Sequence, residues 1–416
     1  MEGSSVFLLC LTASSGVPLY CRSKRSSRQL TFSVIGSLNG VHMFANNQDV
    51  LLTSTRTENS RVLWRTFHES INLIVMSCDS NASDHSLNRL LENVFSTMVL
   101  VIGLDDLMNI KNVERLKKDL RACYKLIDSF LTESEKIGDL TQCVDCVISN
   151  DSVILQECLD GFTQAAESEF GCLLIGGKVV VATEKWWRLA SLDAMLLCWL
   201  VSSLSPHSSR DYPVYLPQGS PTVPHRLLTF QLVPGVDVCI LCGPSPSLQK
   251  VELELVERFW KPVLDPVKSC LRLQLRSFPI SLNLHQGILG FLLINRDLNK
   301  SLYTVQVHPF EDTQRSDIKC ILEHRRASLR SFYTLTMLRY FSPEHHDGKI
   351  QYEEAFPEGF THQAHQCYVV SSSHKCYATK TDLHFLFLLF KTNVPTFSMR
   401  AIANKTMQVF TKEFNF

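Results

Sequence analysis

The stretch SVFLLCLTASSGVPLYC, residues 5–21, decides how this chain begins to fold. Ser5–Thr12 is a short apolar run, and Val17–Cys21 alternates in the way a returning strand does. Between them, Ser14-Ser15-Gly16 has the composition of a turn. The stretch therefore predicts a β-hairpin as the first element of the fold.

The residues after the hairpin complete one module. Apolar residues from Phe32 to Phe44 recur at loosely helical spacing, although Gly36 and Gly40 weaken the helix. Ser83 is placed to cap a later helix. The order is ββαβββαα. The expected elements after the hairpin are a helix over Phe32–Phe44, strands over Val50–Thr55, Arg61–Phe67 and Ile71–Cys78, and helices over Ser83–Ile102 and Val113–Phe130.

Two later modules repeat a similar order. In the second, Gly176-Gly177 predicts a hairpin turn. Four prolines between Asp211 and Pro224 predict an extended connector that is neither helix nor central strand, and Pro262 and Pro266 should kink or break the closing helix. The expected elements are helices over Asp139–Cys146, Ile154–Ala166, Trp186–Leu204 and Ser247–Leu271 and strands over Cys172–Ile175, Lys178–Thr183, Arg226–Leu232 and Val236–Gly243.

The third module begins near Leu284. A polar stretch, Ser342–Gln363, predicts a long loop within it. The expected elements are strands over Ile288–Ile294, Leu302–Val307, Cys367–Ser371, Lys375–Thr379 and His384–Phe390 and helices over Ile318–Tyr340 and Met399–Phe414. We therefore expect an α/β (α+β) chain with one fold repeated in tandem, in domains 1–131, 137–275 and 284–416. Each domain is expected to be an antiparallel five-stranded sheet packed by helices.

Composition limits the kinds of partner. Hydrophobic residues make up 45% of the chain and charged residues 20%, which is typical of a folded globular protein. Lys plus Arg and Asp plus Glu number 41 each, so no net charge draws the chain to nucleic acid or to an anionic membrane. The apolar runs Val6–Leu11 and Leu383–Phe390 are shorter than a membrane span, and no secretory signal is recognisable. We expect a soluble, intracellular protein that binds no nucleic acid.

Cysteine and histidine clusters raise the question of a metal. The fifteen cysteines are an odd number, which favours reduced thiols over a disulfide framework. Cys143/Cys146 and Cys239/Cys242 are two Cys-x-x-Cys pairs, the pattern of a zinc site or a redox pair. The second pair falls in a strand pattern, where residues three apart face opposite sides, so core cysteines are favoured. The histidines are favoured as surface residues over a metal cluster; they are His345, His346, His362 and His365, with Cys367 nearby.

Catalytic and nucleotide motifs are absent from the sequence. No Gly-x-x-x-x-Gly-Lys-[Ser/Thr] occurs, and the nearest match, Gly171–Gly177, has glycine where the phosphate-binding lysine belongs. There is no Gly-x-Ser-x-Gly elbow and no His-Glu-x-x-His helix. We therefore expect a protein that is not an enzyme and that carries no cofactor or metal.

Two surface candidates remain. Arg22, Lys24, Arg25 and Arg28 form a basic loop suited to a phosphate, an acidic partner or a phosphoinositide membrane, with a solvated linker as the alternative. The adjacent tryptophans Trp186-Trp187 cannot both point into the same core, so one of them is an interface candidate, with core packing as the alternative.

Five strings in the chain resemble one known family. They are SSGVPLYCR at 14–22, FSVIGSLNGVHMF at 32–44, NVERLKKDLR at 112–121, IGDLTQCVDC at 137–146 and DYPVYLPQGSPTVPHR at 211–226. Together they are similar to the Fuzzy family of planar cell polarity effectors, a group of tandem longin-domain proteins. The resemblance implies three longin domains, whose hairpin, helix, three strands and two helices agree with the order found independently in the first module.

The resemblance also implies partners. It implies a subunit of the ciliogenesis and planar polarity effector complex at the basal body, a heterodimer with Inturned, and contact with the WD-repeat planar polarity effector. Tandem-longin heterodimers of this kind act as guanine nucleotide exchange factors for Rab-family GTPases. The alternative is a pure assembly scaffold that recruits small GTPases and intraflagellar transport proteins without exchange. The family offers no catalytic residue, and the candidate partner-binding residues are Arg22, Lys24, Arg25, Arg28, Phe32, Ile35, Leu38, Met43 and Phe44.

Overall fold

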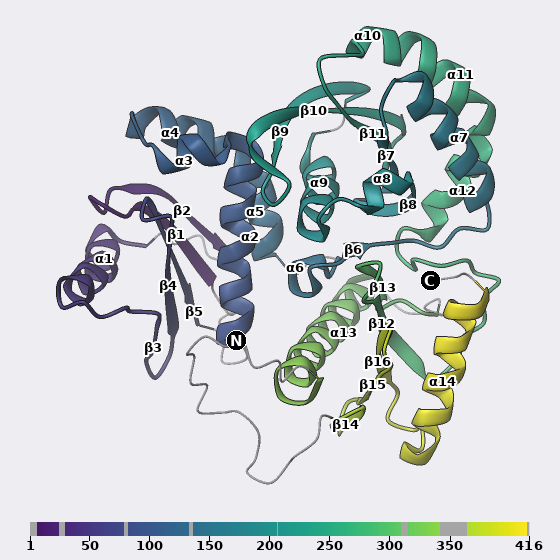
Figure 1. Cartoon of the computed structure of the whole chain (residues 1–416). Coiled ribbons are helices and arrows are strands. Elements are labelled where there is room, and N and C mark those ends of the chain that lie inside the picture. The colour runs from purple at the N-terminus through teal and green to yellow at the C-terminus, as the bar shows by residue number, and fades with distance from the viewer. Residues whose placement is uncertain are drawn as a thin grey trace. The chain divides into compact units, whose positions relative to one another are not determined.

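A computed structural model describes residues 6–24, 30–78, 82–132, 136–205, 207–308, 315–341, 364–413 and 416. The described residues form three β-sheets with helices packed against them (Figure 1). Contacts divide the chain into two compact units. The first consists of Met1–Ser134, Arg188–Phe230 and Cys239–Glu252, and the second of Glu135–Trp187, Gln231–Val238 and Leu253–Phe416.

The first sheet has the strand order β2-β1-β5-β4-β3. Gly16, in the predicted hairpin turn, has a φ of +64°, and a Cβ there would lie 2.0 Å from the side chain of Asn39. The positive φ favours glycine in this turn, and a side chain there would also displace that of Asn39. The strands are β1 Val6–Thr12, β2 Pro18–Lys24, β3 Ser54–Arg56, β4 Arg61–Phe67 and β5 Ile71–Ser77.

The helices of this domain cover both faces of the sheet, with α1 and α2 on opposite sides (Figure 1). Ser83 caps α2 as predicted, because its hydroxyl accepts a hydrogen bond from the backbone N–H of Ser86 at 3.1 Å. The helix predicted over Val113–Phe130 is interrupted by a 3₁₀ turn, η1. The helices are α1 Phe32–Asn47, α2 Asp84–Ile102, α3 Leu104–Met108, α4 Val113–Asp119, η1 Leu120–Cys123 and α5 Tyr124–Leu131.

The strand predicted over Val50–Thr55 is wrong for most of its length, because β3 begins only at Ser54. Val50 donates its backbone N–H to the carbonyl of Ala45 at 3.0 Å, and Asp49 adopts a positive φ of 55°. These residues close the end of α1 and are not available to the sheet.

The second sheet has the order β8-β7-β11-β10-β9. Gly176 and Gly177 both have positive φ values, 54° and 81°, so the predicted hairpin turn is confirmed. The proline-rich connector predicted over Asp211–Pro224 is wrong, since its residues form β9 and the start of β10. Pro213 is tolerated because β9 lies at the sheet edge, and Pro221 and Pro224 fall in β10 where its register with β9 shifts, between Ser220 and His225. The strands are β7 Phe170–Ile175, β8 Lys178–Ala182, β9 Ser209–Leu216, β10 Ser220–Val233 and β11 Val236–Cys242.

The turn between β9 and β10 is anchored by a buried carboxylate. Asp193 accepts backbone hydrogen bonds from Gln218 at 3.0 Å and Gly219 at 2.9 Å. Arg226 on β10 and Asp211 on β9 form an ion pair across the two strands. These polar contacts between residues separated in sequence hold the proline-rich strand in place, and no local sequence pattern indicates them.

The helices of the second domain are more broken than predicted. The single helix expected over Trp186–Leu204 is two helices, α8 and α9. Pro262 breaks the closing helix as predicted, at a 3₁₀ turn, because proline cannot donate the next helical hydrogen bond. The elements are α7 Ser152–Ala165, α8 Glu184–Trp187, α9 Ser191–Ser203, α10 Leu248–Lys250, a π-helical turn η2 Val251–Val256, α11 Glu257–Trp260, η3 Lys261–Val263, α12 Leu264–Cys270 and η4 Leu271–Leu273.

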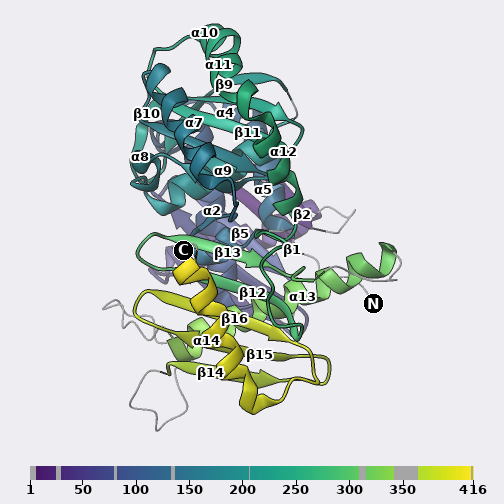
Figure 2. The same cartoon turned by 90° about the vertical axis from the view of Figure 1, so that its right-hand side faces the viewer.

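The third sheet has the order β14-β15-β16-β12-β13-β6. Helix α14 crosses one face of it and α13 lies on the other (Figure 2). The loop predicted over Ser342–Gln363 lies outside the described residues. The elements are β12 Ile288–Asn295, β13 Lys300–Thr304, α13 Arg315–Thr336, a π-helical turn η5 Met337–Phe341, β14 Gln366–Val370, β15 Lys375–Lys380, β16 His384–Phe390 and α14 Thr396–Glu413.

The sixth strand, β6 (Val144–Asp145), corrects two sequence expectations. The sheet is not five-stranded, and the helix predicted over Asp139–Cys146 is only α6, Gly138–Thr141. Gln142 takes a left-handed φ of 57°, which ends the helix. The chain then pairs in parallel with β13, so this segment adds to the third sheet although the sequence assigned it to the second domain.

Buried ionic contacts hold this segment to the third domain. The Asp145 carboxylate accepts hydrogen bonds from the backbone of Gly138 at 3.0 Å and from the hydroxyl of Ser301 at 3.2 Å. Arg330 of α13 forms a bidentate ion pair with Asp139, and its Nη1 lies 3.0 Å from Oδ1. Both side chains of that pair are largely buried, so each charge depends on the other.

We therefore expect the Asp139→Ala substitution to destabilise the protein by about 3–5 kcal/mol, because it leaves the Arg330 guanidinium buried without its partner. The urea midpoint of the second unit, followed by tryptophan fluorescence, should fall. As a control, Glu114→Ala removes an exposed ion pair with Lys117 and should change stability by less than about 0.5 kcal/mol. Equal effects of the two substitutions would contradict the assignment.

Candidate partner-binding surface

Helix α1 is attached to the first sheet by a narrow contact. Ile35 and Leu38 pack against the small core cluster formed by Leu9, Leu11, Val62, Trp64 and Ile74. The indole Nε1 of Trp64 also donates to the backbone carbonyl of Leu38 at 3.1 Å. In α1, His42 is the residue whose whole side chain is buried, and burial lowers its pKa. The candidate residues Ile35 and Leu38 therefore belong to the inner face of α1.

The outer face of α1 is apolar and open. Phe32 is 82% exposed and Phe44 69% exposed, and Val41 and Met43 are also exposed. A Cβ placed on Gly36 or Gly40 would meet no atom within 4 Å, so the helix backbone itself is accessible between these side chains. We call Phe32, Val41, Met43 and Phe44, together with Gly36 and Gly40, the α1 surface. Exposed apolar groups gathered in this way mark an interaction site.

Of the four basic candidates, Arg22 is the one whose side chain lies within the described residues, and it is engaged inside the domain. The Arg22 Nε donates to Asp128 at 2.8 Å, and its guanidinium lies 4.8 Å from the ring centroid of Tyr124. This hydrogen bond to Asp128 is the main reason that the pKa of Arg22 is raised. Arg22 therefore joins β2 to α5 within the domain. Lys24 ends β2, while its side chain, Arg25 and Arg28 lie outside the described residues.

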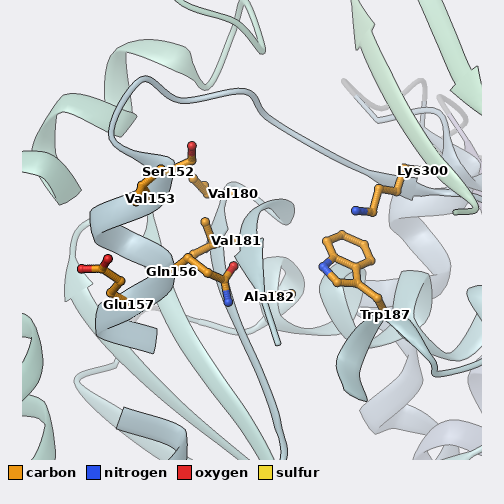
Figure 3. Close-up of a pocket in the computed structure, with 9 residues that line it drawn as sticks. All are labelled: Ser152, Val153, Gln156, Glu157, Val180, Val181, Ala182, Trp187 and Lys300. Carbon is orange, nitrogen blue, oxygen red and sulfur yellow. The ribbon is translucent and has the colours of Figure 1, made fainter. Parts of the chain in front are cut away.

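Trp186 and Trp187 diverge as predicted. Trp186 is fully buried, whereas Trp187 is half-buried and borders a cavity of about 430 Å³ in the second unit (Figure 3). Lys300 reaches the same cavity and places its Nζ 3.8 Å from the centroid of the Trp187 ring. The adjacent tryptophans gave a sequence signal for Trp187. No pattern pointed to Lys300, because it belongs to a distant hairpin.

The cysteines and histidines considered as metal ligands are not grouped into a metal site within the described residues. Within the described residues, no three His, Cys, Asp or Glu side chains gather where they could share a metal ion. The four cysteines of the two Cys-x-x-Cys pairs are buried, and burial raises the pKa of Cys143 to about 12. His345, His346 and His362 lie outside the described residues. None of the described helices combines the length and apolar character that a bilayer crossing requires.

Comparison with known proteins identifies relatives along the whole chain. The family described as First Longin domain of FUZ, MON1 and HPS1 matches residues 6–130, the corresponding Second Longin domain matches 166–261, and the Third matches 287–414. The chain is 77% identical to Protein fuzzy homolog of Xenopus tropicalis over 100% of both proteins. It is 50% identical to Protein fuzzy homolog of Homo sapiens and of Mus musculus over 98% of each.

These matches confirm the resemblance seen in the five strings and the fold class of three longin domains. They do not test the domain boundaries 1–131, 137–275 and 284–416, which stay predictions.

Thiol reactivity tests the interpretation of the cysteine pairs. We expect iodoacetamide at pH 8 to modify the exposed Cys78 and Cys320 first, and Cys143 at least about a hundredfold more slowly, because a buried thiol with a raised pKa is scarcely ionised. Peptide mass mapping over time measures each rate, and urea should remove the difference. If Cys143 and Cys146 reacted as fast as Cys78, the pair would be an accessible one suited to zinc or redox chemistry.

Proposed function

This chain belongs to the Fuzzy family of tandem longin-domain proteins, and from that premise we propose that it is a non-catalytic scaffold subunit of a ciliogenesis and planar cell polarity effector complex. In this proposal it pairs with Inturned, contacts the WD-repeat planar polarity effector, and works in the cytoplasm at the basal body of the cilium. The heterodimer promotes nucleotide exchange on a Rab-family GTPase during cilium assembly and vesicle trafficking.

The α1 surface is the observation that supports pairing. It exposes two phenylalanines and two further apolar side chains on one helix, beside a stretch of bare backbone at Gly36 and Gly40. Covering such a surface with a partner removes apolar area from water, which is favourable by about 25 cal/mol per Å² before the costs of association. We assign this surface to the longin domain of the partner subunit.

Exchange requires no catalytic side chain. A scaffold that binds a nucleotide-free GTPase more tightly than the loaded form weakens nucleotide affinity by the same factor. Shape and differential contacts are sufficient for this linkage, since a ligand shifts an equilibrium only by its difference in affinity for the two states. The absence of catalytic motifs from the sequence is therefore compatible with exchange.

The decisive experiment combines the chain with Inturned and measures release of fluorescent GDP from a panel of Rab GTPases. Release should rise with the purified pair and not with this chain alone. Substituting Phe32→Ser and Phe44→Ser together should weaken the heterodimer by at least about tenfold, as expected for buried aromatic anchors, and should lower release in parallel.

The matched control is Phe397→Ser, which alters a phenylalanine on α14 that is 88% exposed. This variant should pair and promote release as the wild type does. Wild-type pairing by the α1 double variant would exclude the α1 surface. Equal affinity of the pair for nucleotide-free and GDP-loaded GTPase would instead support an assembly scaffold that recruits GTPases and intraflagellar transport proteins without exchange.

A further inference from the structure

The cavity at Trp187 lies along an incompletely covered edge of the second sheet. Strand β8 is at the end of the strand order, so one of its sides has no neighbouring strand of that sheet. The chain's own segment at Cys146–Val147 pairs with this side at Val179, where the Val147 N–H donates to the Val179 carbonyl at 2.8 Å. Beyond that contact, Val180, Val181 and Ala182 line the cavity (Figure 3).

The backbone of Ala182 faces this outer side. Thr183 donates its N–H to the carbonyl of Gly171, on the inner side of the strand, at 2.9 Å. Successive residues of a strand direct their N–H and C=O groups to alternate sides, so those of Ala182, next to Thr183, point outward. The groups of Val179 also point outward, because the register with β7 shifts by one residue between Val179 and Val181. An added strand needs such outward-facing groups to continue the hydrogen-bond ladder.

The opposite side of the cavity supplies a single cation. Lys300 lies with its Nζ over the Trp187 ring, and within the part of the chain that the structure describes it forms no ion pair with a carboxylate. Lys300 is partly buried, and this burial lowers the pKa of its ammonium group. A partly buried cation that forms no ion pair is complementary to one carboxylate of a ligand.

The remaining wall comes from the first turns of α7. Ser152 and Gln156 contribute a hydroxyl and an amide, and Val153 is largely exposed at the rim. Glu157 also lines the cavity, with its carboxylate directed away from Lys300 (Figure 3). The cavity thus combines apolar walls with a few converging polar groups, which is the usual character of a specific binding site. One lysine is too little for a phosphate-rich lipid headgroup or for nucleic acid, which require several cations.

We propose that this groove binds an extended peptide segment of a partner protein, which adds a strand to β8 beyond Val179 and places one Glu or Asp side chain on the ammonium of Lys300. Backbone hydrogen bonds at Ala182 supply affinity, and the Lys300 to carboxylate pair supplies selectivity. An apolar residue next to the acidic one packs on Trp187. The site lies apart from the α1 surface in sequence and chemistry, and it does not depend on GTPase exchange.

The test uses the full chain and two fluorescein-labelled, end-capped heptapeptides of alternating valine and threonine. One carries a central glutamate and the other a central lysine. Fluorescence anisotropy should show at least about tenfold tighter binding of the glutamate peptide. Lys300→Glu should reduce its binding by at least about tenfold and reverse the preference, whereas Lys405→Glu, an exposed lysine on α14, should leave it unchanged.

Ala182→Pro removes the outward N–H without changing charge, and it should weaken both peptides equally. Thermal melting confirms that each variant is folded, and Lys300→Glu remains informative if the proline variant is not. Equal binding of the two peptides, or unchanged binding by Lys300→Glu, would overturn the proposal. So would competition by inorganic phosphate as effective as that of unlabelled peptide, since it would show a small-anion site.

Discussion

Burial of both faces of the central strands is the constraint on which the structure depends. In β1, Leu8 and Cys10 face the large cluster under α2, while Leu9 and Leu11 face the small cluster under α1. Side chains alternate along a strand, so a strand apolar at every position needs a helix layer on each side. The third sheet follows the same rule, with Leu292 packed toward α13 and the Phe291 ring 5.0 Å from that of Phe410 on α14.

The two helix layers of the first domain bury very different numbers of residues, and the layer that buries fewer, α1, leaves the α1 surface exposed. Helix α2 buries ten residues, whereas α1 buries His42 alone and attaches through Ile35, Leu38 and the Trp64 indole. Because α1 contacts its sheet through few residues, most of its surface remains exposed and can contact another protein. In α1 that remainder carries phenylalanines and glycines where an isolated surface helix carries charges.

Local signals in the sequence predicted most elements, and contacts between distant residues account for the failures. The turn at Gly176-Gly177 and the cap at Ser83 depend on neighbouring residues, so a sequence pattern reveals them. Strand β6 pairs with the distant β13 through backbone hydrogen bonds and the contact of Asp145 with Ser301, and no periodicity encodes that pairing. The candidate site divides in the same way. Helical spacing predicted the helix that carries Phe32 and Phe44, but it did not separate these exposed residues from the inward Ile35 and Leu38. The Arg22 bond to Asp128 and the Lys300 position over Trp187 are likewise set by tertiary structure.

The charge balance decides how both proposed surfaces discriminate between partners. With Lys plus Arg equal to Asp plus Glu, no overall field steers a partner to this protein. Recognition then depends on short-range interactions. At the α1 surface these are contacts between apolar groups, and at the cavity beside β8 they are strand pairing and the charge of Lys300. Such surfaces act only when shapes match closely, because neither offers a long-range attraction to a poorly fitting partner. That is the property required of a scaffold that must hold several different proteins in fixed relation without binding others.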